Sequence, residues 1–493
     1  MSTRPIPFDN SYARLPEGFY ARIAPERVPA PARIRMNEPL AERLGIDLAW
    51  LRSEAAVRAF AGNEIPDGAA PIATVYAGHQ FGGWNPRLGD GRAILLGEVV
   101  GTDGVRYDVQ LKGSGRTPYS RGGDGKAPLG PVLREYVVSE AMAALGIPTS
   151  RSLAAVTTGE TVFRETGPLP GAVLARVAQS HLRVGTVQFF AAQDDPEALR
   201  TLLDHVVARH YPEARDAENP YRVVLDGVVT RQATLIARWL SIGFIHGVMN
   251  TDNMLLSGET IDYGPCAFLD EYDPERVYSS IDHGGRYAFG NQPRIAHWNL
   301  AALAQAMLPL LGDDPDRAVA SARAAIDAFA DLFLAAHRHA MLAKLGIAAG
   351  GEEDAALVDG LLAAMAAERV DFTLAFRRLT ELADPSRPPE IAAFFELPPA
   401  LEPWVRRWRE RLAREDGTPA ERRRRMAAVN PVFLPRNHLV EEVIAAAVER
   451  QDFGPFHYLV DLLARPCDWR EDAARYALPP RPEQVVRETF CGT

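Results

Sequence analysis

Short apolar runs separated by glycine-rich turns fill the first part of the chain and are typical of β-strands. The run at 93–100 reads AILLGEVV, and the run at 107–111 reads YDVQL. Similar runs predict further strands at 72–76, 153–157 and 172–177. We expect these strands to form a mainly antiparallel sheet.

One helix interrupts the strand signals. Over 132–147, apolar residues recur at every fourth position from Leu133 to Leu145, and Gly146 and Pro148 follow as a stop signal. This spacing predicts a helix with one buried face.

The pattern changes to helical spacing after about residue 186, where apolar residues recur every three to four positions. An exception is NMLLSGETIDY at 253–263, which predicts two short strands around a Ser-Gly turn. The predicted helices are 201–210, 228–242, 299–311, 318–343, 357–366 and 439–449.

This layout predicts an α+β fold of the two-lobed protein-kinase type. Residues 1–60 are rich in proline and arginine and are expected to wrap around the rest as an extended segment, with one helical patch near 40–51. Residues 61–185 would form a strand-rich, nucleotide-binding N-lobe. Residues 186–493 would form an extended helical C-lobe with the catalytic loop and a C-terminal tail.

Composition narrows the class of partner. The 493 residues carry 54 Lys+Arg and 64 Asp+Glu, a formal net charge of −10, which argues against a general nucleic-acid binder. Three cysteines are too few for a disulfide framework. Because no apolar stretch approaches the roughly 18 to 20 residues of a membrane span, we expect a cytoplasmic protein without a membrane partner.

The segment 246–253 reads HGVMNTDN, and Asp262-Tyr263-Gly264 follows. Kinases carry a loop H-x-D-x-x-x-x-N before a D-F-G triplet, and here the histidine and asparagine keep the kinase offset. Oxygen ligands from two such positions hold a hard Mg²⁺ ion against nucleotide phosphates. Asn253 and Asp262 are therefore the candidate metal ligands.

Val248 stands where a kinase has its catalytic aspartate, and a valine can neither accept a proton nor orient a hydroxyl. Asp252, beside Asn253, is the nearest carboxylate able to act as the base. The alternative is a solvated Asp-Asn turn without a chemical role.

A kinase-like site also needs a strand lysine and a helix glutamate. Lys112 ends the run YDVQLK, and Glu135 lies near the start of the helix at 132–147. Lysine occurs elsewhere only at Lys126 and Lys344, whereas arginine fills nearly all other basic positions. This rarity favours a chemical role for Lys112 over an ordinary surface ion pair.

Two glycine turns are weaker candidates for phosphate contact. Gly89 and Gly91 flank an aspartate before Arg92, and Asp124-Gly125 lies in a loop of glycines and charges. Glycine allows close backbone approach to phosphate, although an exposed turn explains these residues equally well.

Arg176 and Arg183 lie seven residues apart in ARVAQSHLR. Arginine forks match phosphate oxygens, so both side chains could converge on a polyphosphate across a bend. In a chain this rich in arginine, a surface role is the alternative.

Taken together, these segments resemble the selenoprotein O (SelO/YdiU-type) family of pseudokinases that adenylylate proteins. The resemblance covers essentially the whole chain. It rests on FDNSYARLPEGFY, YAGHQFGGWNPRLGDGR, VQLKGSGRTPYSRGGDGKAPLGPVLREY, HGVMNTDNM, IDYGP, NPVFLPRNHLVEE and a cysteine third from the end.

The resemblance implies transfer of AMP from ATP to Ser, Thr or Tyr hydroxyls of proteins, with release of pyrophosphate. ATP would bind in the reverse of the usual kinase orientation. Asp252 would accept the proton, and Asn253 and Asp262 would hold Mg²⁺ or Mn²⁺. The nucleotide contacts would be Gly89, Gly91, Arg92, Lys112, Asp124, Gly125, Arg176, Arg183 and Asp262, with Glu135 positioning Lys112.

Cys491 stands where some members of the family carry selenocysteine, and the family picture includes a disulfide to the segment after D-Y-G. That segment has no cysteine here, and Cys266 is the nearest substitute. A regulatory Cys266–Cys491 disulfide and a mobile thiol without a partner are the two alternatives.

Two other functions remain open from the residues. One is an ordinary phosphotransferase with Asp252 as base, which would release ADP. The other is a catalytically silent, nucleotide-binding scaffold, which would bind ATP without turnover.

Overall fold

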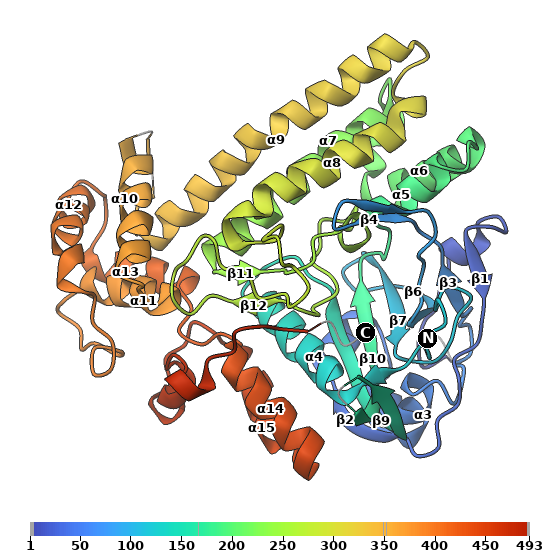
Figure 1. Ribbon diagram of the computed structural model, residues 1–493, viewed down its shortest axis with the longest axis horizontal. Coiled ribbons are helices and arrows are strands. Elements are labelled where there is room, and N and C mark those ends of the chain that lie inside the picture. Colours follow the sequence, from blue (N-terminus) through green and yellow to red (C-terminus); the bar gives the residue numbers. More distant parts are fainter. Residues whose placement is uncertain (1–3, 166, 349, 352, 491–493) are drawn as a thin grey trace.

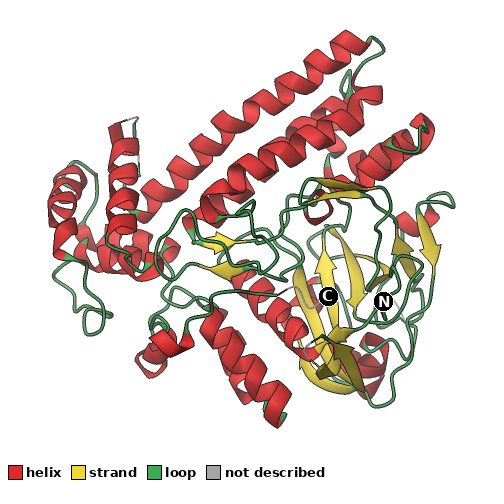
Figure 2. Cartoon of the chain, in the orientation of Figure 1, coloured by secondary structure: helices red, strands yellow, loops and turns green. Residues whose placement is uncertain are grey.

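The computed structural model describes residues 4–165, 167–348, 350–351 and 353–490, and it is a mixed α/β structure. Most strands gather in one half of the molecule, and long helices fill the other half (Figures 1 and 2).

The main sheet has the strand order β1-β3-β6-β7-β10-β9-β2, with β8 beside β10. Neighbouring strands pair antiparallel, as expected, and the five predicted strands are confirmed. The strands are β1 (Tyr20–Arg22), β2 (Ala32–Met36), β3 (Ile72–Thr74), β6 (Ala93–Val100), β7 (Arg106–Lys112), β8 (Ala127–Pro128), β9 (Arg151–Arg164) and β10 (Gly167–Ala178).

The N-terminal segment is built into this sheet. It supplies β1 at one edge and β2 at the other, and neither strand was predicted from the sequence. The helical patch predicted near 40–51 is present. Its helices are α1 (Glu38–Arg43) and α2 (Leu48–Leu51), followed by α3 (Glu54–Phe60).

Helices cover both faces of the sheet. Along β10, Ala172 and Leu174 pack in one cluster with α4 (Leu129–Ala144), whereas Val173 and Ala175 pack in another with the N-terminal helices. Successive side chains of a strand point to opposite faces, so both faces are buried. Double coverage explains why β6 is apolar almost throughout.

The predicted helices are confirmed, and α7, α8 and α9 pack together (Figure 1). Helices α6, α7 and α9 start earlier than predicted. Each begins at an Asp or Asn cap that is followed by proline. A helix with the length and apolar character needed to cross a membrane does not occur in the described part of the chain. The helices are α5 (Val184–Ala191), α6 (Pro196–His210), α7 (Pro220–Ser241), α8 (Gln292–Leu311), α9 (Pro315–Lys344), α10 (Glu353–Ala367), α11 (Phe372–Leu382), α12 (Glu402–Leu412), α13 (Pro419–Val429), α14 (Asn437–Arg450) and α15 (Gly454–Leu463).

The hairpin predicted over 253–263 is wrong. Residues 251–253 form a 3₁₀ turn, and the segment after it bridges to more distant parts of the chain instead of to itself. Leu255 pairs with Arg183, and Thr260 pairs with Thr149. Short two-residue strands, β11 (Phe244–Ile245) and β12 (Ala267–Phe268), instead pair on either side of this segment.

A buried ion-pair network attaches helix α6 to the sheet. Arg209 lies 3.0 Å from Glu98 of β6 and 2.5 Å from Asp108 of β7, and these side chains are almost fully buried. The His181 ring lies 3.0 Å from the same Asp108 carboxylate, through its Nδ1. Arg209 compensates both buried carboxylates, and Arg106 lies 3.4 Å from Glu98 as a second cation.

Replacing Arg209 with alanine should therefore lower the free energy of unfolding by about 3–5 kcal/mol, because buried Asp108 would lose its arginine and buried Glu98 the nearer of its two. Urea unfolding followed by circular dichroism measures this change. Arg200→Ala, on the same helix with a half-exposed side chain, is the control and should cost less than about 1 kcal/mol. Equal losses in the two variants would show that the network does not hold α6.

Candidate active site

Asp262 lies at the centre of a cluster of basic side chains that come from different elements. Its Oδ1 is 2.9 Å from Lys112 Nζ at the end of β7 and 2.6 Å from Arg176 Nη1 on β10. Its Oδ2 is 2.9 Å from Nη1 of Arg183, the residue before α5. The structure thus brings together four site residues predicted from three separate segments of the sequence: the strand lysine, the arginine pair and the D-Y-G aspartate.

Glu135 of α4 holds two of these cations in place. Its carboxylate is 2.5 Å from Lys112 Nζ and 3.1 Å from Arg176 Nη1. Because Glu135 and Arg176 are almost fully buried, the pair fixes the position of Lys112, whose side chain remains partly exposed. This is the contact expected from the sequence between the strand lysine and the helix glutamate.

The electrostatic balance favours an ionised Asp262. Burial alone would raise the pKa of this carboxyl, but Lys112, Arg176 and Arg183 hold the pKa well below its ordinary value. The backbone of Asp262 has a φ of 59°, in the left-handed region that non-glycine residues seldom adopt. Such strain persists where the surrounding structure fixes it, and here the ion pairs do so.

His246 connects the 246–253 segment to the D-Y-G segment. Its Nε2 lies 2.8 Å from the Ile261 carbonyl oxygen, and its Nδ1 accepts from the Val248 N–H at 3.3 Å. Burial lowers the pKa of His246, so the ring is neutral and donates from Nε2. Asn253 donates its amide nitrogen to the Val248 carbonyl at 2.9 Å, so its side-chain oxygen is the atom it can offer to a cation.

Asp252 is buried beside this cluster. Its Oδ2 accepts from Gln80 Nε2 at 3.1 Å, and its backbone carbonyl accepts from Arg183. Its Oδ1 is buried and has no hydrogen-bond partner among the described residues. Burial raises the pKa of Asp252 to about 6, with Arg183 opposing the shift. A carboxylate with one uncommitted oxygen and this pKa is suited to accepting a proton near neutral pH.

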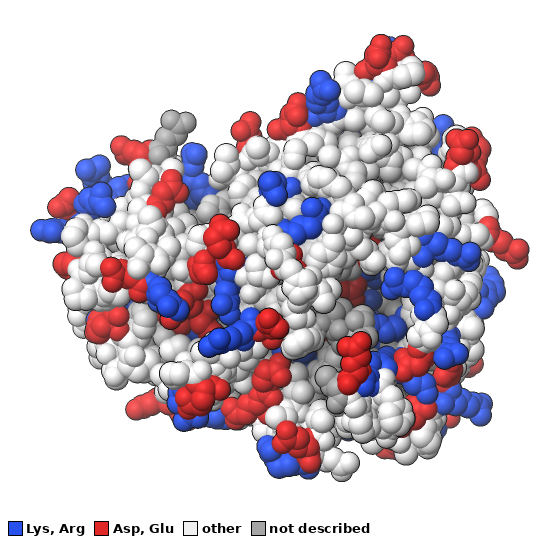
Figure 3. All heavy atoms as spheres, in the orientation of Figure 1, with Lys and Arg blue, Asp and Glu red and all other residues white. Residues whose placement is uncertain are grey.

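Gln80 belongs to a hairpin that covers Asp252 and was not among the residues predicted for the site. The hairpin pairs β4 (Gly78–Gln80) with β5 (Gly83–Asn85). A side chain at Gly78 would place its Cβ 2.7 Å from Asp252 Oδ1, so the close approach requires glycine. On the face seen in Figure 3, a hollow lies between the positions of β4 and β10, with basic side chains along its right margin.

The Gly89–Gly91 turn brings Asp90 to Arg183. Asp90 Oδ1 lies 4.0 Å from Arg183 Nη2, and its Oδ2 accepts from the Thr74 backbone at 2.9 Å. The Tyr119 ring fills the space that a Cβ at Gly89 would need, with a contact of 2.5 Å. The glycines of this turn were predicted from the sequence, and the carboxylate between them was missed.

Arg92 follows this turn at the start of β6. Its backbone carbonyl accepts from the Gly113 N–H at 2.7 Å, directly after Lys112. The turn and the end of β7 are therefore neighbours in space.

Asp124 and Gly125 lie in a separate part of the loop after β7. The Asp124 carboxylate pairs with Arg164 of β9 at 2.8 Å, instead of joining the Asp262 cluster. Gly125 packs so closely against the Gly115 carbonyl that a Cβ would collide with it. These contacts hold the loop against β9 and against its own backbone.

The C-terminal tail reaches the D-Y-G segment. Thr489 donates its hydroxyl to the Pro265 carbonyl at 2.6 Å, and its N–H donates to the Tyr278 carbonyl at 2.7 Å. Cys266 is a buried free thiol, and burial raises its pKa to about 12. Cys491, on which the two alternatives of a Cys266–Cys491 disulfide and a thiol without a partner turn, lies outside the described residues.

The cluster predicts different costs for removing Arg176 and Lys112. Arg176→Met should lower the free energy of unfolding by about 3–5 kcal/mol, because it removes a fully buried cation from two carboxylates. Lys112→Met should cost less than about 2 kcal/mol, since its ammonium is partly hydrated. Urea unfolding of both variants makes the comparison. A loss for Lys112→Met as large as that for Arg176→Met would identify the lysine as structural.

Glu259 provides a test of stability against pH. It is buried, accepts from the Gln179 N–H at 2.9 Å and the Ser257 hydroxyl at 2.8 Å, and burial raises its pKa to about 7. Between about pH 4.5 and 7 the unfolded chain loses this proton before the folded chain does, so folding loses stability as pH rises. Glu259→Gln should match the parent near pH 4 and exceed its unfolding free energy by up to about 3 kcal/mol at pH 8. Urea unfolding at both pH values measures this difference, and a variant no more stable at pH 8 would contradict the assignment.

Comparison with known proteins identifies the family. A family model described as "Protein adenylyltransferase SelO" matches residues 4–464. "Protein nucleotidyltransferase YdiU" of Rhodopseudomonas palustris (strain BisB5) is 59% identical over 489 residues, and a namesake from Methylorubrum extorquens is 60% identical over 495. The namesake of Bradyrhizobium sp. (strain ORS 278) is 58% identical over 488 residues, and each match covers 99% of both chains. The chain therefore belongs to the SelO family of protein adenylyltransferases.

Proposed function

We propose that this protein transfers AMP from ATP to Ser, Thr or Tyr hydroxyls of other proteins and releases pyrophosphate. The observation that carries the proposal is the convergence of Lys112, Arg176 and Arg183 on Asp262, in a member of the SelO family. Three fixed cations in a largely buried site match the charge of a polyphosphate, and fixed charge of this kind stabilises transferring phosphoryl groups.

The proposal includes a two-lobed, kinase-like arrangement. The main sheet with α4 would be the N-lobe and the helices after about residue 186 the C-lobe, with residues 1–60 as the wrapping segment. The Lys112–Glu135 ion pair supports this assignment, because kinases use such a pair to hold phosphate oxygens. The His246–Ile261 contact supports it as well, since it joins the two catalytic segments.

Asn253 and Asp262 would hold Mg²⁺ or Mn²⁺. An amide oxygen and a carboxylate are the hard ligands that these cations take, and Mg²⁺ commonly keeps several waters besides one or two protein ligands. Asp252 is buried on the same 3₁₀ turn as Asn253, and its Oδ1 has no hydrogen-bond partner among the described residues, so a further carboxylate lies beside the proposed cation site. The cation would supply neutralisation of phosphate charge. Asp262 would then exchange part of its contact with the basic side chains, which would become available to phosphate oxygens.

In this scheme ATP binds in the reverse of the kinase orientation, so the α-phosphorus faces the acceptor hydroxyl. Asp252 accepts the hydroxyl proton as the new P–O bond forms, and pyrophosphate leaves. Val248 fits this scheme, because a buried valine at the kinase base position leaves Asp252 as the carboxylate of the loop. Further nucleotide contacts would come from Gly89, Gly91, Arg92, Asp124 and Gly125.

A cytoplasmic location belongs to the same proposal. ATP is abundant there, and a chain with three cysteines does not depend on an oxidising compartment. ATP and hydroxyl-bearing proteins would be its partners.

The experiment is incubation of the purified protein with α-labelled or γ-labelled ATP, Mg²⁺ or Mn²⁺ and a mixed protein substrate. Label should be retained on protein only from the α position. Asp252→Asn should lower the rate by roughly 10² to 10⁴, the range for a positioned general base, and leave ATP binding by calorimetry intact. Asp327→Asn, an exposed carboxylate on α9, is the matched control and should keep the parent rate.

Two results would contradict the proposal. Label retained only from the γ position would show an ordinary phosphotransferase. Label from neither position, with ATP binding intact, would show a nucleotide-binding scaffold.

A further inference from the structure

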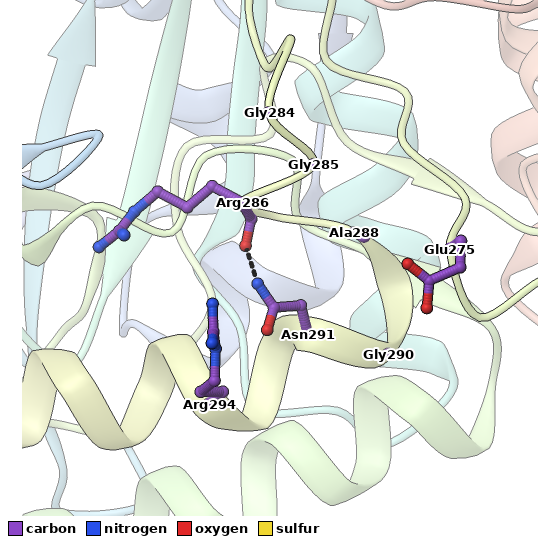
Figure 4. A pocket seen from close by; sticks show the side chains of 8 residues that line it. All are labelled: Glu275, Gly284, Gly285, Arg286, Ala288, Gly290, Asn291 and Arg294. Carbon is purple, nitrogen blue, oxygen red and sulfur yellow. Dashed lines mark hydrogen bonds between the residues drawn. The ribbon is translucent and has the colours of Figure 1, made fainter.

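A second pocket lies between the segment after the D-Y-G triplet and the start of α8. It is open, has a volume of about 450 Å³, and is lined by Arg286, Asn291, Arg294 and Glu275 together with small residues. In Figure 4 Arg294 rises from the first turns of α8, while Glu275 lies on the opposite side of the 284–291 backbone from the two guanidinium groups. The charged side chains of the lining are thus two arginines and one glutamate.

These two arginines are available for a ligand. Among the described residues neither Arg286 nor Arg294 forms an ion pair, whereas the arginines of the Asp262 cluster are all paired. Arg286 is held instead by aromatic rings, 5.0 Å from Trp298 and 5.8 Å from Tyr287. Its backbone carbonyl accepts from Asn291 at 2.6 Å, which fixes the turn (Figure 4). The aromatic rings position the Arg286 guanidinium, and no ion pair among the described residues neutralises it or that of Arg294, as in sites that bind carboxylates.

The pocket is connected directly to the loop that carries Asp252. The Tyr287 hydroxyl donates to Asn250 Oδ1 at 2.5 Å, and the Phe81 N–H donates to the same oxygen at 3.0 Å. Asn250 lies two residues before Asp252, and Gln80 beside Phe81 binds the Asp252 carboxylate. One short network therefore joins the turn that carries Arg286 and Tyr287, the β4–β5 hairpin and the proposed base.

Exposed aromatic side chains lie close to Arg286 and Tyr287. Phe81 is 38% exposed, Trp84 43% and Trp298 37%, which is unusual for large apolar residues. The His79 ring lies 4.9 Å from the Trp84 ring and 5.1 Å from the Trp298 ring, so the tryptophans form one surface. Tyrosine, tryptophan, phenylalanine and arginine are the residues enriched where proteins bind proteins.

We infer that this surface binds the acceptor protein and selects segments that carry an Asp or Glu side chain near the hydroxyl to be modified. The acidic side chain binds in the pocket that Arg286 and Arg294 line, and the aromatic surface packs against the acceptor backbone beside it. Glu275, in the same lining, disfavours a second carboxylate there. The inference rests on the proposed function for its acceptor, and it adds the residues that select that acceptor.

The test measures binding and transfer separately. A fluorescein-labelled peptide with one tyrosine flanked by aspartates, and a matched peptide with asparagines, are titrated with the full-length protein by fluorescence anisotropy. The acidic peptide should bind at least about tenfold more tightly than the neutral one, the effect of a charge-assisted contact. Arg294→Glu and Arg286→Gln should remove this preference and leave the affinity for the neutral peptide unchanged.

Arg323→Glu, at an exposed arginine on α9 outside both sites, is the matched charge control and should keep the preference. Arg294 is exposed, so its replacement should leave the melting temperature unchanged and exclude unfolding as the cause. No preference in the parent protein, or a preference retained in both pocket variants, would overturn the inference.

Transfer of α-label to the peptide tyrosine is read in the same samples. A preference in binding that depends on Arg286 and Arg294, without transfer of label to any peptide, supports the docking surface and contradicts the proposed function. Transfer of label to acidic and neutral peptides with equal KM, in the parent and in both variants, supports the proposed function and contradicts the docking surface.

Discussion

The structure of the candidate site depends on the compensation of one buried carboxylate, that of Asp262. Its three cations come from the end of β7, from β10 and from the residue before α5, so they form a cluster only when the sheet and the helices are assembled. A buried charge without partners would cost several kcal/mol. The ionised Asp262 carboxylate can therefore be buried only where the assembled fold brings these cations to it.

The same requirement explains why the site is strained and polar in a chain that could bury apolar side chains instead. Asp262 adopts a left-handed backbone conformation, and the Asp252 carboxylate keeps one buried oxygen without a partner among the described residues. Both features cost stability. The Arg209 network pairs α6 with β6 and β7 in the same sheet, and its Asp108 lies four residues before Lys112 on β7.

Local patterns were enough to predict much of the fold but not its long-range pairings. The apolar run of β6 and the periodicity of α9 identified their elements, because burial leaves a direct trace in the sequence. The alternation over 253–263 was read as a hairpin, yet Leu255 and Thr260 satisfy their backbone groups with residues far away in the chain. β1 and β2 were missed for the same reason, since an edge strand is defined by a neighbour that the local sequence does not contain.

For the site, the sequence predicted the Lys112–Glu135 pair and the Arg176–Arg183 pair, but not that Asp262 joins them. The structure brings Lys112, Arg176 and Arg183 to Asp262, and Glu135 to Lys112 and Arg176. Gln80 and Asn250 had no charge to attract attention, although a neutral amide is well suited to bridging a base and a neighbouring surface. Asn250 accepts from both Tyr287 and Phe81 of the β4–β5 turn, and it lies two residues before Asp252. Under the proposed function, one short hydrogen-bonded loop would therefore link the surface that selects the acceptor to the base that activates it.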